Sequence, residues 1–172
     1  MLFCTQLTEG MNRFKLLVIT IVLIPMIGFS QTQVDNLFNK YSDKEGVSAV
    51  NISKEFLILM TGVSDSIASG ILSKLEGVKV ISIEDSTLSN SINFYKELED
   101  ADYFRKNKIE TLMEVTKDGD KMSLMGNKAN NSKEYSELLF FSRGQNNTFI
   151  SIKGIISPES VAHVLKLVNV TF

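Results

Sequence analysis

The sequence predicts an α+β fold, with a mostly antiparallel sheet of about five to six strands and helices packed on one face. Three observations predict it. Helix-like and strand-like segments are mixed in the first half, the second half holds four strand-like segments joined by short turns, and apolar residues alternate along those strands. Strands joined by short turns are antiparallel neighbours, which favours α+β over a parallel α/β sheet.

A basic and then apolar segment precedes the predicted fold. Arg13 and Lys15 stand before the apolar run 16–27, which is typical of a secretory signal. The run has about 12 residues, whereas a helix needs roughly 20 to span a bilayer. We therefore expect a cleaved signal peptide over residues 11–30 rather than a membrane anchor, and an exported protein that is periplasmic or secreted.

The residues around the expected cleavage point are small. Gly28 and Ser30 occupy the third and first positions before Gln31, so cleavage is expected between Ser30 and Gln31. Met11 begins the signal pattern directly, and residues 1–10 are interpreted as an over-extended start. Residues 31–172 are then long enough for a single α+β domain with its own core.

Composition excludes several classes of function. The formal net charge of −2 shows no basic excess, so nucleic acid is not expected as a partner. The single cysteine, Cys4, precedes the signal, so the domain has no thiolate nucleophile, disulfide or cysteine-based metal site. We expect no cofactor and no membrane span after signal cleavage.

The first half of the chain is predicted to form helices and two strands. A helix is expected over 35–41 and a strand over 47–52, followed by a helix for which Ser53 is a suitable N-cap. The run 56–60 is apolar all round, which is typical of a helix buried on most sides or of a strand.

The next elements follow from capping residues and patterning. A helix is expected to begin near Ser64 or Asp65 and to end at Gly77 as C-cap. We expect a strand over 78–83 and one long helix over 89–103.

The second half contains the clearest turn signal. Asp118-Gly119 lies between the segments 111–117 and 120–127 and predicts a two-residue hairpin that sets Val115 opposite Met122. Two further strands are expected over 134–142 and 148–156. Ser157 and Pro158 then predict the cap and first residue of a final helix.

Three phenylalanines mark a candidate interaction patch. Phe140 and Phe141 must point to opposite faces of one strand. If Phe149 lies across from Phe140, the two rings form an aromatic pair on the wetter face of the sheet. This pair is the predicted docking patch, and a helix that covers that face is the alternative.

Candidate catalytic residues are few. His163 is expected on the solvent side of the last helix, without a partner to orient it. The acidic cluster Glu97, Glu99, Asp100 and Asp102 could bind a divalent cation, but a solvated helix face explains it better. No nucleophile elbow, phosphate-binding loop or zinc motif is present, so we expect no enzyme and assign no catalytic or metal residue.

Several segments together resemble the family of domain of unknown function 4252. They are GFSQ, VDNLFNKYSDKEGVSAVNISKEFL, FYKELED, LMEVTKDGDKMSLMG and ELLFFSRGQNNTFISIKGIIS. The resemblance implies a small exported α+β domain of Bacteroidota-type bacteria, often encoded near sigma-factor regulatory genes, with no catalytic residues to carry over. Many relatives have a lipoprotein cysteine after the signal, where this chain has Ser30 and Gln31.

Two functions are therefore expected from the sequence. The first is an exported, non-catalytic binding or interaction module with an envelope protein as partner, linked to envelope signalling. The alternative is a small periplasmic hydrolase or metal-dependent enzyme that uses the acidic residues, for which converging carboxylates in a cleft are required.

Overall fold

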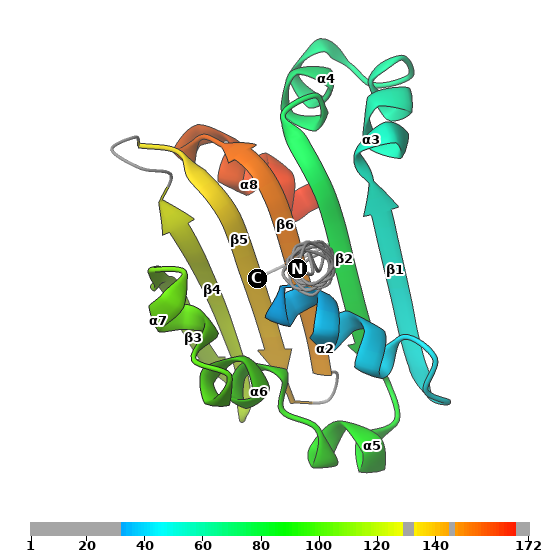
Figure 1. Cartoon of the computed structure of the whole chain (residues 1–172), viewed down its shortest axis with the longest axis vertical. Coiled ribbons are helices and arrows are strands. Elements are labelled where there is room, and N and C mark those ends of the chain that lie inside the picture. Colours follow the sequence, from blue (N-terminus) through cyan, green and yellow to red (C-terminus); the bar gives the residue numbers. More distant parts are fainter. Residues whose placement is uncertain (1–31, 129–132, 145–146, 168–172) are drawn as a thin grey trace, which may run out of the picture. The chain divides into compact units, whose positions relative to one another are not determined.

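A six-stranded antiparallel sheet forms the centre of the structure, a computed structural model that describes residues 32–128, 133–144 and 147–167 (Figure 1). The strand order is β1-β2-β6-β5-β4-β3, and every neighbouring pair is antiparallel. The strands are β1 (Val47–Ser53), β2 (Leu75–Ile83), β3 (Ile109–Lys117), β4 (Asp120–Lys128), β5 (Tyr135–Arg143) and β6 (Asn147–Ile156). The predicted α+β class and antiparallel sheet are confirmed.

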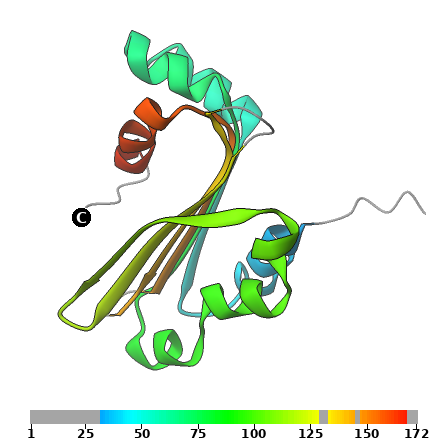
Figure 2. The same cartoon turned by 90° about the vertical axis from the view of Figure 1, so that its left-hand side faces the viewer.

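Seven helices accompany the sheet in the described part of the chain. They are α2 (Gln33–Tyr41), α3 (Lys54–Thr61), α4 (Ser66–Leu72), α5 (Ser86–Ser91), α6 (Phe94–Asp100), α7 (Tyr103–Lys106) and α8 (Pro158–Leu167). Figure 2 shows α2, α5, α6 and α7 on one side of the sheet and α8 on the other. The expected helical layer on one face is present, and α8 lies across the second face.

Each face of the sheet carries its own apolar cluster, because successive side chains of a strand point to opposite faces. The first cluster joins the sheet to α2, α6 and α7, and its buried members include Val34, Phe38, Ile81, Phe94, Leu98, Tyr103, Leu139, Phe141 and Phe149. The second joins the opposite face to α3 and α4, and its buried members include Leu57, Ile71, Leu72, Val78, Leu124, Leu138, Phe140, Ile150 and Ile152.

The predicted hairpin is confirmed together with its register. Lys117 pairs with Asp120 and Val115 pairs with Met122 across β3 and β4. Asp118 and Gly119 have φ of 53° and 91°, so both turn residues are left-handed. Such a turn matches the right-handed twist of the strands, which is why this dipeptide favours a two-residue hairpin.

The single helix expected over 89–103 is wrong, because three short helices occupy that region. Asn93 accepts a hydrogen bond from the backbone N–H of Lys96 at 3.1 Å and begins α6 as a new N-cap. Asp102 then adopts a left-handed φ of 59° between α6 and α7. These two local interruptions outweigh the continuous apolar periodicity.

Gly77 was expected to end a helix, and this prediction is wrong. Helix α4 already ends at Leu72, and β2 begins at Leu75. Gly77 lies inside β2 opposite Ser53 of β1, and a Cβ there would stand 3.3 Å from the backbone oxygen of Ile52. Gly77 therefore permits close approach of two strands rather than a helix cap.

The expected start at Met11, the signal peptide over 11–30 and the cleavage point at Ser30 and Gln31 lie outside the described residues. Within the described part, no helix is both long and apolar enough to cross a membrane.

Candidate functional site

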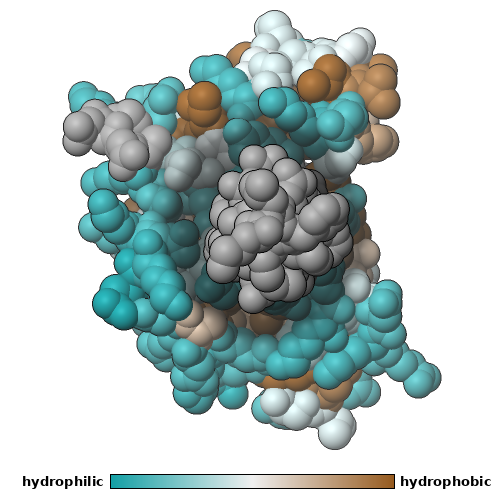
Figure 3. All heavy atoms as spheres, in the orientation of Figure 1, coloured by the Kyte–Doolittle hydropathy of each residue, from teal (hydrophilic) through white to brown (hydrophobic). Residues whose placement is uncertain are grey.

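Helices α3 and α4 and the turn between them, residues 54–72, form a helical hairpin that exposes large apolar side chains. The most exposed are Val63 at 80%, Leu59 at 73% and Ile67 at 63%. Phe56, Ile58 and Met60 are exposed as well. Figure 3 shows hydrophobic residues gathered at this end of the molecule, beside α3 and α4. Single exposed apolar residues are ordinary, but a contiguous group marks an interaction surface.

Local capping and three buried side chains hold this hairpin in place. Ser53 caps α3 by accepting from the N–H of Phe56, and Asp65 caps α4 by accepting from the N–H of Ala68 at 2.8 Å. Leu57, Ile71 and Leu72 belong to the second apolar cluster and anchor the base of the hairpin. The two short helices have no other buried residues, so their remaining apolar side chains face solvent.

Helix α4 also has open space beside its backbone, close to Ile67. Gly70 is one turn further on the same helix, so the two residues share a face. A Cβ at Gly70 would meet nothing within 4 Å. An element of a partner could therefore approach the backbone of α4 closely at this point.

A second feature is a polar cleft on the other face of the sheet, above the first apolar cluster. Its volume is ≈ 410 Å³, and its lining includes Asp35, Asn51, Lys79, Ser151 and Lys153. Strand register brings these residues together, since Asn51 pairs with Lys79 and Lys79 pairs with Ser151. Polar residues of three strands therefore meet at one level of the sheet, beside the N-terminal end of α2.

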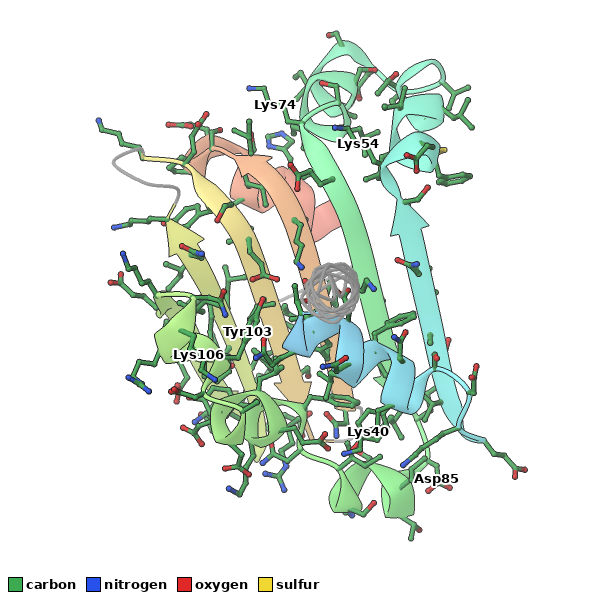
Figure 4. All side chains as sticks on the ribbon, in the orientation of Figure 1. Lys40, Lys54, Lys74, Asp85, Tyr103 and Lys106 are labelled. Carbon is green, nitrogen blue, oxygen red and sulfur yellow. The ribbon has the colours of Figure 1, made fainter. Side chains whose placement is uncertain are left out.

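Glu137 lies next to this cleft and is buried. It pairs with Lys153 in the β5–β6 register. Its Oε2 accepts from the Tyr103 hydroxyl at 2.7 Å, and its Oε1 accepts from the Ser151 hydroxyl at 3.1 Å. Burial raises the pKa of Glu137 above its ordinary value, although the hydroxyl of Tyr103 and the charge of Lys153 oppose that shift. Figure 4 shows Tyr103 beside β5 on this face.

The two half-buried lysines of the cleft, Lys79 and Lys153, differ in their partners, and a third, Lys54, is exposed. Lys79 Nζ forms a salt bridge of 2.7 Å with Oδ1 of Asp35, and both side chains are about three-quarters buried. Burial raises the pKa of Asp35, but the bonds from Lys79 and Thr32 outweigh it and the pKa is lowered. Lys153 makes no salt bridge within the described residues, and its Nζ lies 3.4 Å from the hydroxyl oxygen of Thr32.

The predicted Phe140/Phe149 patch is wrong. Phe149 pairs with Phe141, and Phe140 pairs with Ile150. Phe140 therefore belongs to the second cluster and Phe149 to the first, on opposite faces, and both rings are buried. The expectation failed because each face of the sheet is covered, so no wetter face carries an aromatic pair.

The acidic cluster does not converge on a cleft. Glu97 accepts from Lys40 at 2.7 Å and from the hydroxyl of Tyr41, while Lys96 and Arg105 pair with Asp100 and Asp102 respectively. These carboxylates therefore support helix contacts at the surface. His163 is exposed on α8, and no group of three or more metal-ligating side chains occurs in the described ranges.

Sequence reasoning missed both features. The apolar run 56–60 was expected to be a helix buried on most sides or a strand, but it lies in a helix in which only Leu57 is buried. All-round apolarity is a signal that fits either a buried helix or an exposed apolar surface, and it does not distinguish between them. Glu137 had a weaker signal, a single carboxylate in an apolar strand, and its partners come from distant elements.

The chain belongs to the family described as a domain of unknown function, DUF4252, whose model matches residues 41–164. The match runs from the end of α2 into α8, and it includes the α3–α4 hairpin and the strand residues of the cleft but not Asp35. No curated protein and no solved structure matches the chain.

Proposed function

We propose that this chain is an exported, non-catalytic interaction module that binds a partner protein through the α3–α4 hairpin. The observation that carries the proposal is the group of strongly exposed apolar side chains of Leu59, Val63 and Ile67 on one helical hairpin. Burying such a group against a partner removes apolar surface from water, which stabilises the complex by about 25 cal/mol for each Å² buried. The proposal that the protein is exported rests on the N-terminal sequence pattern alone.

The charge of the hairpin favours a protein partner over a lipid surface. Helices that lie on membranes are rich in lysine and arginine on their polar face. From Lys54 to Leu72 the hairpin has one basic residue against Glu55 and Asp65, and α4 has no charged residue. The open backbone face at Gly70 also suits close packing of a partner helix.

Site-specific photocrosslinking in the native host tests the proposal. A photoreactive phenylalanine is placed at Leu59 or Val63, and a control is placed at Lys117, an exposed residue at the end of β3. We expect both hairpin positions to crosslink to one protein, identified by mass spectrometry, and the control to give no such product. The variant Leu59→Ser/Val63→Ser should lose the partner but remain folded, since both residues are exposed.

A matched control distinguishes specific binding by this surface from non-specific binding by exposed apolar residues. Val50→Thr alters another exposed apolar residue, which lies on β1, and should leave the crosslink unchanged. Products that contain only lipid, or only a second copy of this chain, would contradict a protein partner. An unchanged product in the double serine variant would also contradict the proposal.

A further inference from the structure

The lining of the polar cleft includes none of the exposed apolar residues Leu59, Val63 and Ile67, and the cleft has the features of a small-ligand site. Its ≈ 410 Å³ falls within the roughly 300–1,000 Å³ typical of ligand clefts. Its floor is built on strands β1, β2 and β6, whose register fixes the positions of Asn51, Lys79 and Ser151. Sites on strands are more rigid than sites on loops.

Of the three lysines that line the cleft, Lys54 is exposed, and only Lys79 and Lys153 are half-buried. Lys79 is neutralised by Asp35 at 2.7 Å. The oxygens of Glu137 are occupied by the hydroxyls of Tyr103 and Ser151. Lys153 attracts Glu137 electrostatically, but no salt bridge joins the two in the described residues.

Lys153 is half-buried, and its nearest hydrogen-bond acceptor among the described residues is the Thr32 hydroxyl at 3.4 Å. Good N–H···O bonds span roughly 2.7–3.2 Å. A half-buried ammonium with one long bond is under-satisfied, and an anion in the cleft would supply the missing acceptor.

We propose that the polar cleft binds a small carboxylate ligand, whose anionic group pairs with the ammonium of Lys153. A singly charged anion suits the site, because Lys153 is the one half-buried lysine of the lining without a salt bridge in the described residues. The carboxylates of Asp35, Glu55 and Glu76 also line the cleft. A doubly charged phosphate would be repelled more strongly by these groups. The exposed amide of Asn51 adds a neutral donor on the cleft wall. This site does not depend on the partner proposed for the hairpin.

Titration of the purified protein with acetate at pH 7, followed by backbone amide NMR, tests the site. We expect saturable shifts at Asn51, Lys79, Ser151 and Lys153. Lys153→Met should weaken binding by about tenfold or more, as expected for loss of one charge-assisted hydrogen bond. Lys153→Arg keeps the charge and should retain binding.

Two controls make the outcome decisive. Lys121→Met removes a lysine that pairs with Glu114 at 2.9 Å, away from the cleft, and should leave acetate affinity unchanged. Inorganic phosphate, compared with acetate at pH 8 where it is mostly doubly charged, should bind more weakly than acetate. Equal acetate affinity in Lys153→Met, shifts that never saturate, or tighter binding of phosphate would each overturn the proposal. The NMR spectrum of each variant also reports whether it is folded.

Discussion

The hydroxyl of Tyr103 donates to Oε2 of Glu137 at 2.7 Å, with exposed fractions of only 3% for Tyr103 and 5% for Glu137. This bond joins α7 to β5. Burial and the neighbouring carboxylate of Glu137 raise the pKa of Tyr103, so Tyr103 stays a donor throughout the accessible pH range. Glu137 therefore has a hydrogen-bond donor at every accessible pH, and its raised pKa reflects the cost of burying its ionised form.

Glu137→Gln should change how stability depends on pH. Burial raises the pKa of Glu137 in the folded state above its unfolded value, near 4.5. The stabilisation that Glu137 contributes to the folded state is therefore fully present below the unfolded pKa and is lost as pH rises through the folded pKa. Glutamine fills similar space without a charge. The free energy of unfolding of the variant, relative to wild type, should therefore increase from pH 4 to pH 8 in urea denaturation. A difference that is constant or decreases would contradict the assignment.

Tyr103→Phe should destabilise the protein by about 1–3 kcal/mol, because it leaves a buried carboxylate with one donor fewer. The loss should be greater at pH 8 than at pH 4, since the ionised form of Glu137 needs the donor most. Tyr95→Phe is the matched control, because the hydroxyl of Tyr95 makes no hydrogen bond within the described residues. Urea denaturation of both variants at the two pH values checks this. Equal losses in the two variants would argue against a role for the hydroxyl of Tyr103.

Local sequence signals predicted the strands well. The turn at Asp118-Gly119 fixed both the hairpin and its register, because two left-handed residues are required there and few residue pairs supply them. The next two strands, β5 and β6, were predicted from the alternation of apolar and polar residues. Asn93 and Asp102 show the limit, since caps inside an apolar stripe divided one expected helix into three.

The candidate sites depended on information that local patterning does not contain. The pairing of Phe141 rather than Phe140 with Phe149 depends on a loop between β5 and β6, and a register change of one residue exchanges the faces. Tyr103 and Ser151 meet Glu137 only through tertiary packing. The surface of α3 and α4 was misjudged because apolarity was equated with burial.

Gly70→Ala should stabilise the fold by about 0.5–1 kcal/mol, since glycine in a helix interior costs about that much relative to alanine. Nothing lies within 4 Å of the position that the new Cβ would take. Thermal or urea denaturation measures the gain. The same variant should weaken partner crosslinking from Val63 if a partner element packs directly on Gly70. A loss of stability would show that the space is filled.

Gly154→Ala should have the opposite effect, with a destabilisation of about 2 kcal/mol or more. Gly154 has φ of 146°, and an added Cβ would lie 2.5 Å from the backbone oxygen of Lys74 and 2.6 Å from Cα of Leu75. These contacts are with backbone, where β6 meets the start of β2, so no side chain can move to relieve them. Gly119→Ala is the control, because its φ of 91° is also strained but its surroundings are open. Urea denaturation should give the larger loss for Gly154→Ala, and equal losses would show that backbone conformation rather than close approach requires glycine at that position.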